Sequence, residues 1–104
     1  MQEGARFLAP VKKLVPRNDH AAAGLSDWER YGPAKTGFAE QVYFMELAAD
    51  ASGQTTAMLH DAAESKGVAI SYDVNQLPCF SLWKNTVPLE NGYVTGLELS
   101  LIHI

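Results

Sequence analysis

Hydrophobic and polar side chains alternate with a period of two over several short runs of this chain, and turn-forming residues separate those runs. This period is typical of β-strands, whose successive side chains point to opposite faces. The pattern predicts five strands, over residues 40–47, 55–60, 68–74, 79–84 and 93–98. Turns are expected at Asp50–Gln54, Glu64–Gly67 and Asn91–Gly92, the first of them closing a hairpin. Five successive strands favour an antiparallel sheet or half of a sandwich.

The first part of the chain has a weaker strand pattern. Residues 5–15 form a plausible extended segment, but Pro10 and Pro16 limit it to an edge strand or an ordered coil. Residues 16–37 are rich in Gly, Pro, Asn and Asp, which predicts a long connection with a helical turn near 21–28. Trp28 and Tyr31 in this connection either form a lid or, as we expect, pack onto the sheet.

Helix is the competing prediction for residues 41–49 and 57–66, which are rich in Ala, Glu, Leu and Met. We favour strands because Gly53 and Gly67 fall where hairpin loops belong. Gly37 also leaves no obvious N-cap before the first of these segments.

Length and charge narrow the possible functions. A chain of 104 residues is long enough for one small domain. The net charge is −4 and the eight basic residues are scattered, so we expect no nucleic-acid partner. No run approaches the roughly 20 apolar residues of a spanning helix, and the N-terminus starts no secretory signal. We therefore expect a cytoplasmic protein with no membrane partner.

Metal and cofactor sites are not expected either. The single cysteine, Cys79, excludes an internal disulfide and a Cys-cluster metal site, and its neighbours Pro78 and Phe80 predict a buried side chain. No Gly-rich phosphate loop or metal-ligand spacing is present. His20, His60 and His103 belong to no recognisable catalytic arrangement, so we interpret all three as bystanders.

The segment from Leu77 to Glu98 carries the most informative chemistry. Trp83 offers a flat apolar ring for a pyranose, and Lys84 and Asn85 offer hydrogen-bond donors. Glu98 offers a carboxylate that can act as a base. These are the side-chain types of a sugar site.

The segments EGARFLAPVKKLVPRND, GFAEQVYFMELAAD, LPCFSLWKNT and GYVTGLE resemble the C-terminal part of an aldose 1-epimerase-related family with a galactose mutarotase-like fold. The resemblance covers nearly all of residues 3–98. It implies an all-β fold in which an antiparallel sheet forms part of a larger β-sandwich, here truncated. It also implies a small-molecule sugar as the partner and no cofactor.

The resembled family implies roles for individual residues. Glu98 corresponds to the glutamate that removes a proton from the anomeric hydroxyl, and Glu40 and Gln41 fall where an acidic residue contacts sugar hydroxyls. The acid histidine belongs to a segment upstream of EGARF, so we expect the chain by itself to be inactive. A binding module that holds a sugar without turning it over is the alternative. A structural β-domain is a third interpretation, favoured only if Trp83 and Glu40 are buried and paired.

The last six residues, LSLIHI at 99–104, correspond to the translation of a transposon-end adaptor used in sequencing libraries. We therefore interpret residues 1–98 as part of a mutarotase-like domain and residues 99–104 as an adaptor-derived tail. A natural final strand is the alternative, because LSLIHI also alternates.

Overall fold

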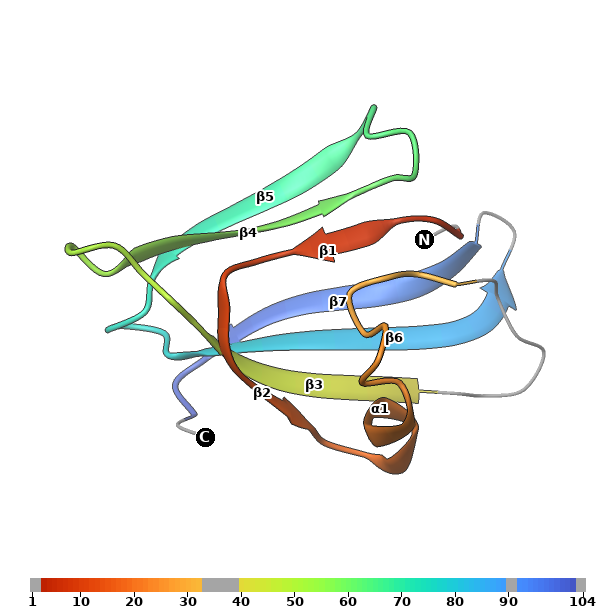
Figure 1. Ribbon diagram of the computed structural model, residues 1–104, viewed down its shortest axis with the longest axis horizontal. Coiled ribbons are helices and arrows are strands. Elements are labelled where there is room, and N and C mark those ends of the chain that lie inside the picture. Colours follow the sequence, from red (N-terminus) through yellow and green to blue (C-terminus); the bar gives the residue numbers. More distant parts are fainter. Residues whose placement is uncertain (1–2, 33–39, 90–91, 103–104) are drawn as a thin grey trace.

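The computed structural model describes residues 3–32, 40–89 and 92–102, which form two facing antiparallel sheets and one short helix (Figure 1). The smaller sheet has the strand order β1-β4-β5 and the larger sheet the order β2-β3-β6-β7. The elements are β1 (Arg6–Leu8), β2 (Val11–Pro16), α1 (Asp19–Ala23), β3 (Glu40–Leu47), β4 (Gln54–His60), β5 (Gly67–Asp73), β6 (Cys79–Leu89) and β7 (Gly92–Ser100). The predicted all-β class is confirmed.

The core lies between the two sheets and follows from alternation along each strand. In β3 the buried residues are Tyr43, Met45 and Leu47, while the residues between them are only partly covered. Phe80 of the larger sheet contacts Phe7 of the smaller one, with ring centroids 5.4 Å apart. Each sheet thus buries one apolar face against the other, which is the arrangement that stabilises a two-layer β fold.

Residues 40–47 and 54–60 are strands, so the helical alternative for these two segments is wrong. The hairpin predicted at Asp50–Gln54 is also wrong, because β3 and β4 lie in different sheets. A turn does occur there, and the Asp50 carboxylate accepts hydrogen bonds from Ser52 N at 2.9 Å and Gln54 N at 3.0 Å. This turn carries the chain from one sheet to the other instead of returning it alongside β3. The hairpin predicted between β4 and β5 is confirmed.

The N-terminal segment contributes one strand to each sheet. β1 pairs with β4 and β2 pairs with β3, and both lie at the edge of their sheets, as the prolines predict. The helix begins earlier than the predicted turn near 21–28. Asn18 is its N-cap, since the Asn18 side chain accepts a hydrogen bond from Ala21 N at 2.8 Å.

Residues 28–31 extend the smaller sheet along the free edge of β1. Phe7 N donates to Glu29 O at 2.7 Å, and Tyr31 N donates to Ala5 O at 2.9 Å. The Trp28 ring lies 5.7 Å from the Phe7 ring between centroids, and Tyr31 is buried. Trp28 and Tyr31 therefore pack onto the sheets and do not form a lid.

The C-terminal strand continues beyond Glu98. Leu99 pairs with Phe80, and Ser100 pairs with Cys79, which is buried as predicted. The side chains of Leu101 and Ile102 are exposed. The described structure therefore includes the first residues of the LSLIHI segment in β7, and the adaptor origin of that segment stays a prediction.

Within the described parts of the chain, no helix is both long and apolar enough to cross a membrane.

Two buried tyrosines predict opposite responses to loss of their hydroxyl groups. The Tyr72 hydroxyl has no hydrogen-bond partner among the described residues, whereas the Tyr43 hydroxyl donates to Gln41 Oε1 at 2.8 Å. An unsatisfied buried hydroxyl costs free energy, so Tyr72→Phe is expected to raise the free energy of unfolding by about 1 kcal/mol. Tyr43→Phe is expected to lower it by about 1 kcal/mol. Thermal unfolding of both variants tests this pair, and equal destabilisation by both would contradict it.

Candidate functional site

The larger sheet carries every residue predicted to bind or turn over a sugar. Its register places Gln41 opposite Lys84 and Lys84 opposite Thr95. Residues directly opposite in an antiparallel pair share a face, whereas neighbours along a strand point to opposite faces. Glu40 and Gln41 therefore lie on different faces, and so do Trp83 and Lys84.

The outer face, which points away from the smaller sheet, carries Glu40, Trp83, Asn85 and Glu98. This follows because the residues between them along the strands, such as Leu82, are buried in the core. Glu98 is exposed, and Glu40 and Trp83 are half-buried. Trp83 and Glu40 are therefore not buried as the purely structural interpretation requires.

Trp83 lies at the centre of this outer face, against the bare backbone of Gly96. A Cβ atom added at Gly96 would lie 3.3 Å from Trp83 Cε3, so the indole ring occupies the space above that glycine. Glu98 lies on β7, two residues after Gly96, which is opposite Trp83. Glu40 lies on β3, two residues before Val42, which is opposite Trp83 on the other side. Ordinary strand spacing puts each of them about 8 Å from Trp83 in the plane of the sheet. The tryptophan thus has one carboxylate on either side.

Arg17 adds a cation that the sequence analysis missed. Its guanidinium carbon lies 5.0 Å from the centroid of the Phe44 ring, and Phe44 alternates with buried Tyr43 and Met45. Phe44 therefore lies on the outer face, and the guanidinium covers part of it. The sequence shows an arginine directly after Pro16, the last residue of β2. Only the pairing of β2 with β3 shows that its guanidinium reaches the Phe44 ring.

Lys84 lies on the inner face, and its ammonium group holds residues 28–31 against the larger sheet. The side chain is 3% exposed. Its Nζ donates to Trp28 O and, at 2.9 Å, to Arg30 O, and it lies 4.6 Å from the Tyr31 ring centroid. Burial lowers the pKa of Lys84 to about 8, against the opposing effect of the Asp27 and Glu29 carboxylates. Lys84 therefore stabilises the fold and cannot also reach a ligand on the outer face.

Gln41 and Thr95 complete an inner polar row with Lys84. Gln41 Oε1 accepts the hydrogen bond from the Tyr43 hydroxyl, and burial raises the pKa of Tyr43 to about 12, with a smaller contribution from Asp27. Thr95 Oγ1 donates to Trp83 O at 2.7 Å and lies 2.7 Å from the Tyr31 hydroxyl. Because Thr95 has one proton to donate, the Tyr31 hydroxyl is the donor in the second bond. The inner polar row is thus a set of internal hydrogen bonds.

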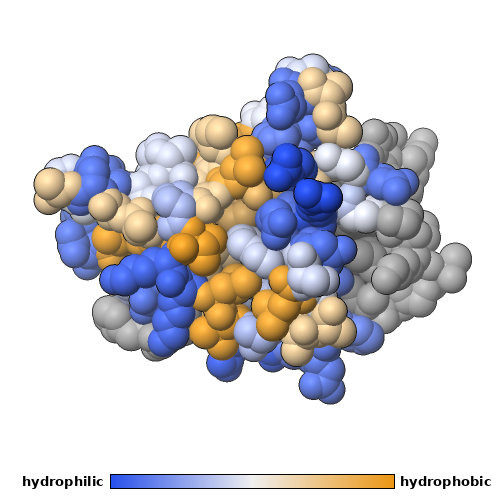
Figure 2. Space-filling model, viewed as in Figure 1, coloured by the Kyte–Doolittle hydropathy of each residue, from blue (hydrophilic) through white to orange (hydrophobic). Residues whose placement is uncertain are grey.

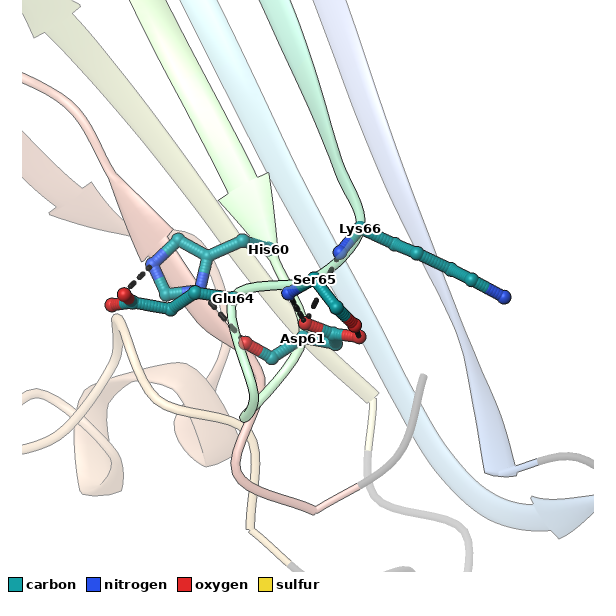
Figure 3. Close-up of polar contacts among 5 residues, drawn as sticks. All are labelled: His60, Asp61, Glu64, Ser65 and Lys66. Atoms are coloured by element: carbon teal, nitrogen blue, oxygen red, sulfur yellow. Dashed lines mark hydrogen bonds and ion pairs between the residues drawn. The ribbon is translucent and has the colours of Figure 1, made fainter.

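A second polar cluster occupies the turn between β4 and β5 (Figure 3). The Asp61 carboxylate accepts from Ser65 N at 2.8 Å and from Ser65 Oγ at 2.7 Å, and these and further backbone bonds lower the pKa of Asp61. His60 Nδ1 lies 2.8 Å from Asp61 O, and His60 Nε2 lies 4.0 Å from a Glu64 carboxylate oxygen. These bonds stabilise the turn, and the interpretation of His60 as a bystander stays a prediction.

A cleft of about 620 Å³ adjoins this turn, lined by small residues such as Ala62 and Gly67 and by larger ones such as Leu59 and Lys66. It includes none of the six residues predicted to form the sugar site. Its polar side chains are largely engaged within the turn, so we place the candidate site on the outer face of the larger sheet and not in this cleft.

Neither of the other two histidines belongs to a described strand of the larger sheet. His20 is exposed on α1, and His103 lies outside the described residues. Among the residues that the structure describes, no three His, Cys, Asp or Glu side chains group in a way that could hold a metal ion.

The two facing antiparallel sheets place the chain in the class of aldose 1-epimerase-like β proteins. The chain belongs to the family described as a domain of unknown function, DUF4432, whose model matches residues 1–103. The predicted relation to an aldose 1-epimerase-related family is thereby confirmed.

Among solved structures, the chain is similar to a crystal structure of a putative aldose 1-epimerase from Klebsiella pneumoniae subsp. pneumoniae. The two share 43% sequence identity, with a TM-score of 0.88 over 95% of this chain. The chain spans about a quarter of the length of that protein, 26%. No curated protein matches the chain at a significant level.

Burial of Lys84 predicts an unusual dependence of stability on pH. The native ammonium loses its proton near pH 8, whereas an ordinary lysine keeps it until about pH 10.5. The unfolded state therefore binds more protons than the native state between these values, and the free energy of unfolding rises with pH there, by at most ~3 kcal/mol. Raised pKa values of Tyr43 and Tyr72, both about 12, oppose the rise only above pH 10.

Lys84→Met is expected to abolish this rise between pH 8 and 10, and Lys13→Met, at an exposed lysine of β2, is expected to keep it. Urea unfolding at a series of pH values measures the slope. The same slope in Lys84→Met as in the wild type would show that another group is responsible.

Proposed function

We propose that this chain forms part of the sugar site of an aldose 1-epimerase-like isomerase, on the outer face of the larger sheet. The observation that supports this most directly is the Trp83 ring lying over Gly96, with Glu98 on one side and Glu40 on the other. An aromatic ring covers the apolar face of a pyranose, and carboxylates bind its hydroxyl groups. The similarity to a protein named as an aldose 1-epimerase supports the same assignment.

In the proposed reaction, the Glu98 carboxylate removes the proton from the anomeric hydroxyl. A second group delivers a proton to the ring oxygen, the C1–O5 bond breaks, and the open-chain aldehyde forms. Rotation about the C1–C2 bond and closure on the other face give the opposite anomer. Glu98 returns its proton to the new anomeric oxygen, and the second group recovers its proton from the ring oxygen. The reaction needs a base and an acid but no electron acceptor, so we propose no cofactor. The acid is proposed to come from outside the described residues.

Substrate contacts are proposed for Glu40, Asn85 and Trp83, which share the outer face with Glu98. Lys84 and Gln41 do not belong to this set because both are hydrogen-bonded in the core. A cytoplasmic location fits a sugar isomerase and is part of the proposal.

The second candidate function is a binding module that holds a sugar without turning it over. The observation that favours it is that the described histidines, His20 on α1 and His60 on β4, belong to other elements than the sheet that carries Glu98. Such a module would use Trp83, Glu40 and Asn85 in the same way but would need no acid.

Mutarotation of α-D-glucose and α-D-galactose, followed by polarimetry in the longer protein that carries this chain, tests the proposal. Glu98→Gln is expected to lower kcat by about 100-fold or more while KM changes little, because the carboxylate accepts the proton in the transition state and contributes little to substrate binding. Trp83→Ala is expected to raise KM. Glu46→Gln makes the same chemical change on the same outer face and serves as the control.

Undiminished kcat in Glu98→Gln would refute the base assignment. Normal sugar binding without any mutarotation in the wild type would favour the binding module. The 104-residue chain alone is expected to show no acceleration.

A further inference from the structure

Two arginines face each other on the smaller sheet, where residues 28–31 run along β1. Arg6 and Arg30 form an antiparallel bridge, flanked by the Phe7 N to Glu29 O and Tyr31 N to Ala5 O hydrogen bonds. The pair lies between these two hydrogen bonds, and no backbone hydrogen bond joins Arg6 directly to Arg30. In this type of pair the Cα atoms are about 4.5 Å apart and the side chains are at their closest.

Both arginines point away from the core. The residues that alternate with them, Ala5, Phe7 and Tyr31, are at most 2% exposed, whereas Arg6 and Arg30 are exposed. His60 lies opposite Arg6 on the neighbouring strand and so shares this outer face. Arg30, Arg6 and His60 thus form a basic row across three adjacent segments. Figure 2 shows strongly hydrophilic residues gathered over the start of β1, beside an apolar area.

This arrangement is unfavourable without a counterion, since like charges directly opposite each other destabilise a sheet. Within the described structure, neither guanidinium has a carboxylate oxygen within ion-pair distance, and the His60 imidazole has Glu64 at 4.0 Å. Glu3 and Asp27 line a cleft of about 450 Å³ beside the two arginines without pairing with them. The charge of the arginine pair is therefore not neutralised by the residues described.

We propose that the basic row binds a phosphate group, either as free inorganic phosphate or as a phosphate monoester whose organic part occupies the adjacent cleft. Each guanidinium presents a planar fork of N–H donors that matches two phosphate oxygens. A phosphate monoester has three terminal oxygens and inorganic phosphate has four, so either can engage both forks, whereas a carboxylate has only two oxygens. The site lies on the outer face of the smaller sheet, on the opposite side of the core from Trp83, so it is separate from the proposed sugar site.

Titration of the ¹⁵N-labelled 104-residue chain with inorganic phosphate, glucose 6-phosphate and glucose, at constant ionic strength, tests the proposal by NMR. Both phosphates are expected to shift the amide signals of Arg6, Arg30 and His60, and glucose is not. Tighter binding of glucose 6-phosphate than of phosphate would identify a monoester as the ligand, and equal binding would identify the free ion. Arg6→Gln and Arg30→Gln are each expected to weaken phosphate binding about tenfold. Lys12→Gln removes the same charge from an exposed position on β2 and is expected to have little effect.

Stability supplies a second readout. In phosphate-free buffer, Arg30→Gln is expected to melt no lower than the wild type, because it removes a like-charge pair. Phosphate is expected to raise the melting temperature of the wild type by more than that of this variant at the same phosphate concentration. The proposal is overturned if phosphate shifts no signal in the basic row, or if Lys12→Gln weakens binding as much as the arginine variants. It is also overturned if Arg30→Gln melts well below the wild type in phosphate-free buffer.

Discussion

The antiparallel register of β3, β6 and β7 is the constraint on which the rest of this structure depends. It aligns Gln41, Lys84 and Thr95 in a row that faces the smaller sheet, and it turns Trp83 and Gly96 to the other side. A slip of one residue would exchange the two faces. Lys84 would then lose the carbonyl groups of residues 28–31. Trp83 would turn into the core, and Phe80 and Leu82, now fully buried, would turn out to solvent.

Residues 28–31 connect the two layers and explain why a buried ammonium group is tolerated. Their backbone pairs with β1 of the smaller sheet, and their carbonyl groups accept from Lys84 of the larger one. Burying a charge is costly unless it is hydrogen-bonded. Two carbonyl acceptors and the faces of Tyr31 and Tyr43 offset part of that cost, and the remainder lowers the pKa of Lys84 to about 8. The same contacts remove Lys84 from any ligand site, which leaves the outer face to Trp83 and the carboxylates.

The local pattern of the sequence predicts where the strands lie along the chain, but it does not predict which strands pair with each other. Alternation placed β3 correctly because Tyr43, Met45 and Leu47 repeat every second residue, and it does not say which sheet a strand joins. For that reason the sequence predicts a hairpin at the turn after Asp50, although the chain crosses there from one sheet to the other. Residues 28–31 have no strand pattern of their own, and only β1 beside them makes them strand-like.

The candidate site was predicted in part. Alternation alone predicts that Trp83 and Lys84 lie on opposite faces of the sheet, and so do Glu40 and Gln41. It does not predict whether the lysine or the tryptophan faces the core. Lys84 is buried because the backbone of a segment more than 50 residues away supplies its acceptors, and such a contact leaves no local signal. Arg17 was missed for the same reason, since its partner ring belongs to β3.

The central claim is that the larger sheet binds a sugar on its outer face and uses its inner face for folding. NMR titration of the 104-residue chain with D-galactose and D-glucose, following side-chain as well as backbone signals, tests it most directly. The account predicts shifts of the Trp83 indole N–H and of the Gly96 and Glu98 amides, with the Lys84 and Gln41 side-chain signals unchanged. Sugar-dependent shifts confined to Lys84 and Gln41, or to the cleft beside Ala62, would contradict it.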